Sequence, residues 1–211
     1  MEDNNSMNSC LMLAMGLYTP VELGSIFDSA DYKDTGLELD SHITLLYAQG
    51  KLLPRKMILD DVKTLVNWET FDKMISETSR LKVFDYFELS SFENDSDYLI
   101  LKLKQDTSIF NKLKVINLGL RKKYGVSSEF TDYTPHITLV ELQPGKAKKY
   151  LGSNCLKKVL EDSLVDFEDI VLSYGTSSEV TDRKQYFLTN HKSVDRYFRL
   201  KNLRKSNDEL E

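Results

Sequence analysis

Cysteine, histidine, proline and tryptophan are scarce in this chain. Its 211 residues include two cysteines, three histidines, four prolines and one tryptophan. Cys10 and Cys155 stand far apart, so the sequence has neither a disulfide framework nor a CxxC motif. It also has no HxH or HExxH pattern, no Walker A motif and no GxGxxG loop. We therefore expect no metal and no cofactor.

Long apolar runs and an excess of positive charge are also missing. No stretch approaches the roughly 20 apolar residues that a membrane-spanning helix needs, and the opening MEDNN is acidic where a secretory signal would be basic. The formal net charge of −5 argues against a protein that grips long nucleic acids through counterion release. We expect a cytoplasmic monomer that binds neither membranes nor long nucleic acids.

One tetrapeptide occurs twice, as His42-Ile43-Thr44-Leu45 and His136-Ile137-Thr138-Leu139. Each copy lies in a run rich in β-branched and aromatic residues, 39–48 and 133–142, which is typical of a strand. Side chains at positions i and i+2 of a strand share a face. Each histidine should therefore point the same way as its threonine, and the isoleucine and leucine should point to the opposite, apolar face.

Two imidazoles and two hydroxyls suit phosphodiester cleavage without a metal. A neutral imidazole withdraws a proton from the attacking hydroxyl and a charged one protonates the leaving oxygen, while hydroxyls stabilise charge on the nonbridging oxygens. We predict His42 and His136 as the acid-base pair and Thr44 and Thr138 as the phosphate-binding residues. The alternative is two half-buried strands whose histidines only pack, and the duplication makes that alternative weaker.

These paired H-x-[ST]-hydrophobic motifs resemble the 2H phosphoesterase superfamily, which includes RNA cyclic phosphodiesterases, 2',5'-phosphodiesterases and RNA end-trimming enzymes. The resemblance implies an α+β fold of two pseudo-symmetric lobes, with antiparallel sheets enclosing a central cleft and helices on the flanks. It also implies a metal-independent monomer. Only the two tetrapeptides are specific, although the layout of the whole chain is consistent with it.

The subfamily is indicated by the positions that follow each motif. RNA-ligase-like bacterial members carry arginine there, as H-x-T-L-x-R, whereas this chain has Tyr47 and Glu141. The acidic charge and the opening Gly16-Leu17-Tyr18-Thr19-Pro20 look more like the phage anti-CBASS phosphodiesterases, which degrade cyclic di- and trinucleotide messengers. The resemblance then implies cleavage of 3'-5' linkages in the host cell cytoplasm.

The order of predicted elements repeats with the motifs. In each half of the chain, a motif strand is followed by a helix and then by two strands. This repeat predicts a single domain spanning residues 1–211, with one lobe at about 10–107 and the other at about 125–195. Helices are expected at 54–66, 108–123 and 147–160, and the segment 27–40 is expected to be a loop. The remaining strands are expected at 10–17, 81–92, 98–104, 166–174 and 185–189.

Base recognition calls for flat side chains near the site, because stacking contributes about 1–3 kcal/mol per base. Tyr18 and Trp68 stand at loop-like positions and are predicted to bind substrate. Tyr47 and Tyr133 are odd-numbered in strands whose catalytic face is even-numbered, so simple alternation places both on the core side. Glu141 is predicted as a further substrate contact, which requires a bulge or a strand end.

Two alternatives stay open. An RNA 2',3'-cyclic phosphodiesterase or a 2',5'-oligonucleotide phosphodiesterase would act on a short RNA end with the same residues. A binding protein that sequesters cyclic nucleotides would need a phosphate site but not two acid-base groups. His191 has no threonine two residues later and is expected in a surface turn.

Overall fold

A computed structural model describes residues 7–77, 80–127, 132–175 and 180–186. His191 lies outside the described residues. Within these ranges, nine strands form one sheet in the order β4-β8-β1-β3-β7-β6-β5, with β2 pairing to β7 and β9 to β8. The strands are β1 Asn8–Tyr18, β2 Tyr32–Leu37, β3 His42–Ala48, β4 Leu81–Lys82, β5 Phe87–Glu93, β6 Asp97–Leu103, β7 His136–Leu142, β8 Leu164–Gly175 and β9 Val180–Tyr186. The helices are α1 Ile58–Leu65, α2 Trp68–Glu77, α3 Val83–Tyr86, α4 Ser108–Tyr124, α5 Ala147–Leu151 and α6 Asn154–Glu161.

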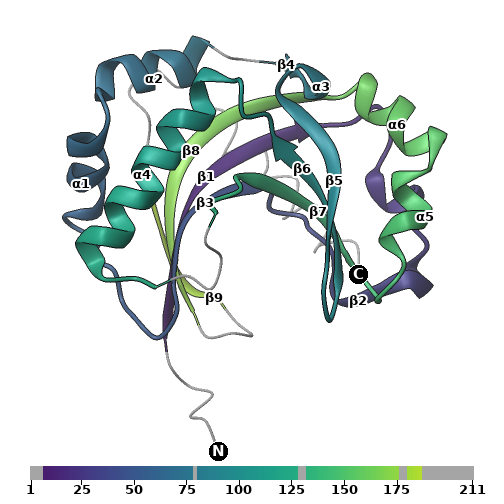
Figure 1. The fold of residues 1–211 in the computed structure, drawn as a ribbon, viewed down its shortest axis with the longest axis horizontal. Coiled ribbons are helices and arrows are strands. Elements are labelled where there is room, and N and C mark those ends of the chain that lie inside the picture. Colours follow the sequence, from purple (N-terminus) through teal and green to yellow (C-terminus); the bar gives the residue numbers. More distant parts are fainter. Residues whose placement is uncertain (1–6, 78–79, 128–131, 176–179, 187–211) are drawn as a thin grey trace, which may run out of the picture.

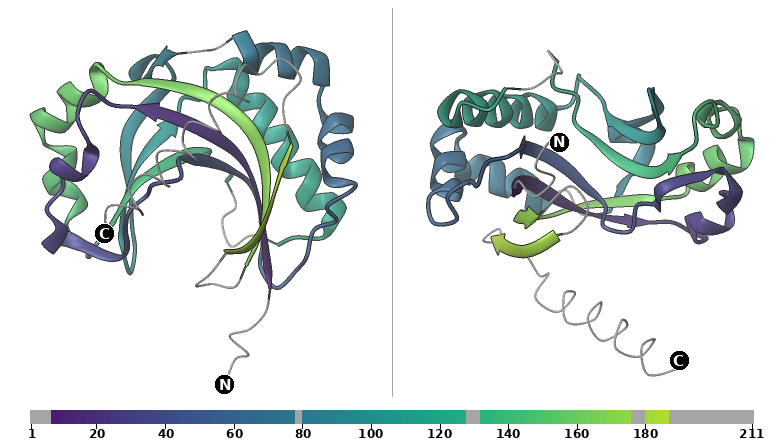
Figure 2. Two further views of the ribbon diagram at one scale, coloured as in Figure 1. Left: turned by 180° about the vertical axis from the view of Figure 1, so that it is seen from behind. Right: turned by 90° about the horizontal axis from the view of Figure 1, so that it is seen from below.

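The sheet is antiparallel throughout and curls into an arch (Figure 1). Five of the helices lie outside the arch in two groups, α1, α2 and α4 at one end and α5 and α6 at the other, as the views from behind and below also show (Figure 2). None of the helices in the described ranges is long and apolar enough to cross a membrane. The predicted α+β class, with antiparallel strands and flanking helices, is confirmed.

The core lies between the outer face of the sheet and the helices. In β6, Leu99, Leu101 and Leu103 share one face at the two-residue period of a strand and are fully buried, and Ile100 between them is fully buried as well. On α4, Leu113, Ile116 and Leu120 are equally buried and recur at helical spacing. This helix ends as expected at Gly125, whose φ of 59° is a left-handed conformation that glycine adopts readily.

Strands from the first half of the chain lie on both sides of the β3–β7 pair. β5 and β6 pair with the second motif strand, β7, through β6, while β8 pairs with β1 and so joins the first motif strand, β3. Strands β5 and β6 of the first half therefore lie on the side of the second motif, and β8 of the second half lies on the side of the first, while the lobe limits 10–107 and 125–195 stay a prediction. Alternation of apolar residues shows which face of a strand is buried, but it does not show which edge of the sheet the strand joins.

Several local elements differ from the sequence expectations. The expected loop 27–40 contains β2, and the expected strand 81–92 is interrupted by the single-turn helix α3. The expected helix 147–160 breaks into α5 and α6, where Ser153 caps α6 by accepting a hydrogen bond from the Leu156 amide. Helix α2 was not expected, although its apolar residues Trp68, Phe71 and Ile75 recur at helical spacing and pack on the core.

Candidate active site

The two motif strands meet at the centre of the sheet. β3 and β7 pair antiparallel through Ile43 and Ile137, and this register brings His42 toward Thr138 and Thr44 toward His136. The burial pattern is the same in both tetrapeptides. Isoleucine and leucine are buried, whereas histidine and threonine are half-buried. The predicted division of each strand into an apolar face and a His-Thr face is confirmed, and the His-Thr face is the inner, concave one.

Both histidine rings are held in the same way. Nδ1 of His42 lies 2.7 Å from the carbonyl oxygen of Asp40, and Nδ1 of His136 lies 2.7 Å from that of Thr134. A carbonyl oxygen only accepts, so Nδ1 carries the proton in each ring. Nε2 is then the nitrogen that can take a proton from a substrate or give one to it. The same ring nitrogen is therefore oriented away from the backbone carbonyl in both motifs.

The surroundings of the two rings differ. Phe92 of β5 packs against His136 edge to face, with ring centroids 4.9 Å apart. Burial lowers the pKa of His136 below its usual value, and repulsion from His42 acts in the same direction, which outweighs the opposing hydrogen bond to Thr134. His136 is therefore neutral at neutral pH, as a general base must be. The carbonyl contact of His42 is exposed to solvent.

Removing the phenyl cover of His136 provides a test of this electrostatic difference. In Phe92→Ala the ring is better hydrated, so its pKa should rise toward the ordinary value of about 6.5. His136 would then protonate at a higher pH, and the acidic limb of the kcat/KM profile should move upward in pH. NMR titration of the histidines measures the shift without a substrate. Phe92→Leu, which keeps an apolar cover, should retain most of the wild-type behaviour, and an unshifted titration in Phe92→Ala would contradict the assignment.

Each motif strand carries a β-bulge at the same place. Leu11 pairs with Leu46 but Met12 pairs with Thr44, which leaves Leu45 as the extra residue. Likewise Leu99 pairs with Val140 and Ile100 with Thr138, leaving Leu139. A bulge shifts the alternation by one residue. Positions five residues after each histidine therefore return to the His-Thr face.

The bulge reverses the expectation for Tyr47. The sequence placed this side chain in the core, but it is 49% exposed while Leu46 is 1% exposed. Tyr47 lies opposite Cys10 on β1, and Cys10 Sγ lies 4.0 Å from Oγ1 of Thr44. Burial and the nearby Cys10 raise the pKa of the Tyr47 phenol. An aromatic ring accessible to a base therefore lies beside the first His-Thr pair, where sequence alternation missed it.

Tyr133 is a supporting residue of the same pair. Its hydroxyl donates to the Thr44 carbonyl at 2.8 Å, and burial raises the pKa of this phenol well above its usual value. The next carbonyl, that of Leu45, accepts from the Asn117 side-chain amide of α4 at 2.7 Å. Two side chains from distant parts of the chain thus satisfy the carbonyls at the bulge.

The hydrogen bond from Asn117 to the bulge should contribute to stability. Asn117→Ala leaves the buried Leu45 carbonyl without this donor, and we expect the free energy of unfolding to fall by about 1–3 kcal/mol. Chemical denaturation measures the change. The matched control is Leu118→Ala on the exposed side of the same helix, which should cost about 0.5 kcal/mol or less. Equal losses in the two variants would show that the bulge does not depend on this contact.

Glu141 follows the second bulge and so faces the His-Thr side, as its predicted role requires. It is only 6% exposed, and its carboxylate accepts hydrogen bonds from the Thr35 amide at 3.2 Å and from the Tyr98 hydroxyl at 3.0 Å. Burial alone would raise the pKa of Glu141, but hydrogen bonds from Thr35, Ser96 and Tyr98 outweigh it and hold the pKa below the ordinary value. The carboxylate ties β2 and β6 to β7.

The two aromatic residues predicted to bind substrate lie in different places. Tyr18 ends β1 on the same face as Ala14, the residue opposite His42. Its ring lies over Gly16, where an added Cβ would come within 2.7 Å of the Tyr18 hydroxyl oxygen. Trp68 begins α2 in the helix layer and packs against Phe71 with ring centroids 5.8 Å apart. The structure therefore does not bring Trp68 to the His-Thr face.

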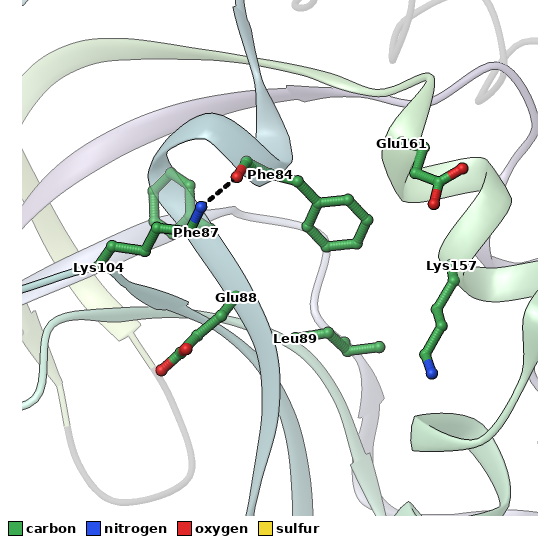
Figure 3. Close-up of a pocket in the computed structure, with 7 residues that line it drawn as sticks. All are labelled: Phe84, Phe87, Glu88, Leu89, Lys104, Lys157 and Glu161. Atoms are coloured by element: carbon green, nitrogen blue, oxygen red, sulfur yellow. Dashed lines mark hydrogen bonds between the residues drawn. The ribbon is translucent and has the colours of Figure 1, made fainter.

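A cavity of about 380 Å³ lies elsewhere, between β5 and α6 (Figure 3). Its lining residues are Phe84, Phe87, Glu88, Leu89, Lys104, Lys157 and Glu161. Across the described ranges, no three His, Cys, Asp or Glu side chains gather as a metal site would require.

No protein-family model matches the chain, and no curated protein is similar to it in sequence. Among solved structures, Usb1 from Kluyveromyces marxianus is 11% identical, with a TM-score of 0.37 over 85% of this chain and 98% of that one. The same Usb1 with uridine monophosphate is 10% identical, with a TM-score of 0.36 over 87% of this chain and 100% of that one. A further structure, a phosphoesterase, is 10% identical, with a TM-score of 0.36 over 83% of this chain and 99% of that one. Likeness at this level does not indicate a function.

Proposed function

We propose that this chain is a metal-independent phosphodiesterase of the 2H type, in which His42 and His136 act as an acid-base pair on one phosphodiester. The observation that carries the proposal is the Ile43–Ile137 pair, which joins two identically oriented His-Thr pairs on one face of the sheet. A purely structural role for both histidines does not require Nδ1 to be fixed in the same way twice.

The environments of the two rings suggest their roles. His136, which is neutral at neutral pH because burial lowers its pKa, withdraws the proton of the attacking 2'-hydroxyl through Nε2. His42 in its charged form donates a proton to the 5' oxygen as the bond to phosphorus breaks. Thr44 and Thr138 donate hydrogen bonds to the nonbridging oxygens. The first products are a 5'-hydroxyl and a 2',3'-cyclic phosphate.

The proposed substrates are cyclic di- and trinucleotide messengers, and the proposed role is a viral counter-defence of the anti-CBASS kind in the cytoplasm of the host. The net charge of −5 supports a short, closed ligand over a long strand. Tyr18 and Tyr47 lie on the His42 face and offer rings on which bases can stack. Arginine is missing at both positions five residues after the histidines, which disfavours the RNA-repair branch.

The test is chromatography of reactions containing EDTA and the purified protein. One reaction contains a 3',5'-linked cyclic dinucleotide and the other an RNA fragment that ends in a 2',3'-cyclic phosphate. Linearised dinucleotide formed by the wild type alone, and not by His42→Ala/His136→Ala, is the expected result. Conversion of the RNA end alone would move the substrate to RNA, and tight binding without turnover would indicate a sequestering protein.

A further inference from the structure

Lys102 lies directly beside the second His-Thr pair. It is the antiparallel partner of His136, and side chains of such partners on one face have Cβ atoms about 4.5–5.5 Å apart. The neighbours Leu101 and Leu103 are fully buried on the helix side, so alternation places Lys102 on the face of His136. The Lys102 side chain therefore starts beside His136, one strand farther from the β3–β7 seam, and its ammonium extends toward Glu88 of β5.

The first His-Thr pair has no such cation at the equivalent place. The partner of His42 on β1 is Ala14, which carries no charge. The two His-Thr pairs are alike, and the positive charge of Lys102 is present beside only one of them. Because the scissile phosphate belongs at the seam between the two histidines, Lys102 is placed where the chain of the substrate continues past His136.

The present partner of Lys102 is easily exchanged. Its ammonium lies 3.3 Å from a carboxylate oxygen of Glu88, and the two side chains are 31% and 54% exposed. Exposed ion pairs of this kind are weak, and a lysine has three donors on a flexible stem. Figure 3 shows Glu88 pointing away from Leu89 and Lys157, toward the side of the sheet opposite to α6. The pair keeps Lys102 on the concave face.

We propose that Lys102 binds a second phosphate of the substrate, the one that is not being cleaved. This role rests on the proposed function and makes it more specific, because a ligand with two phosphates is preferred over one with a single phosphodiester. A cyclic dinucleotide has the required second phosphate, whereas a dinucleoside monophosphate lacks it. Lys102 is then a specificity residue for the former class.

The experiment compares KM and kcat for these two substrates in the wild type, Lys102→Met and Glu88→Gln. The quantity compared is the KM for the cyclic dinucleotide divided by the KM for the dinucleoside monophosphate. In Lys102→Met this ratio should rise about 10-fold, because one charge-assisted hydrogen bond to the second phosphate is lost. Its KM for the cyclic dinucleotide should also depend less on salt. Glu88→Gln removes the same ion pair but keeps the cation, so its ratio should stay within about twofold of the wild type.

An unchanged ratio in Lys102→Met would overturn the proposal. An equal loss of kcat on both substrates would also overturn it, because it would place Lys102 at the scissile phosphate. Matching shifts in Lys102→Met and Glu88→Gln would reduce the role of Lys102 to its ion pair. If the wild type cleaves the cyclic dinucleotide, the proposed function stands and these outcomes concern Lys102 alone. A wild type that cleaves neither substrate would overturn both the proposed function and the role of Lys102.

Discussion

Replacement of His136 by alanine is expected to lower kcat by about 10²- to 10⁴-fold, the usual contribution of a positioned acid or base. The ring is half-buried on the concave face, and the adjacent Ile137 supplies the packing at the seam. The fold should therefore survive the change. Single-turnover rates with saturating substrate measure the chemical step.

A second substitution controls for the loss of the side chain. His136→Asn keeps a group that can donate to the Thr134 carbonyl but cannot exchange a proton near neutrality. It should lose as much activity as His136→Ala, with an unfolding midpoint close to that of the wild type. A variant of either kind with wild-type turnover would remove His136 from the mechanism.

The second large effect is expected on the substrate. A cyclic dinucleotide with deoxyribose in place of both riboses should not be cleaved, because the attacking 2'-hydroxyl is missing. Well-oriented intramolecular attack has an effective molarity of about 10⁵–10⁸ M, so the loss should exceed that of either histidine variant. Chromatography after long incubation measures the remaining rate.

A mixed analogue with one ribose and one deoxyribose serves as the matched control. It should be opened once, at the linkage beside the ribose, and should leave a 2',3'-cyclic phosphate there. Cleavage of the doubly deoxy compound at the normal rate would show that water attacks the phosphorus directly. Thr44, Thr138 and the histidines would then need different roles.

The repeated tetrapeptide was sufficient to predict the two motif strands and the face on which each histidine and threonine lies. This succeeded because a strand has a period of two, so His42 and Thr44 must share a side whatever the rest of the chain does. The longest helix, α4, was also predicted, from the helical period of its apolar residues. α4 has buried residues at helical spacing and a glycine at its C-terminal end, and both are local signals.

The positions of Tyr47 and Lys102 depend on distant contacts and could not be read from local pattern. The carbonyl at the first bulge is held by Asn117, on a helix far along the chain, so the reversal at Tyr47 leaves no trace in the periodicity of β3. Lys102 reaches His136 because β6 joins β7 and not β3. Trp68 looked like a loop residue and is instead the start of a packed helix.

The measurement that tests the central claim most directly is turnover of a cyclic dinucleotide in EDTA by the wild type, His42→Ala, His136→Ala and the double variant. When two groups act together on one phosphodiester, the losses of rate caused by substituting each of them do not add. Each single variant should lose about 10²- to 10⁴-fold, and the double variant should lose much less than the product of those factors. Wild-type turnover in the double variant would contradict the account.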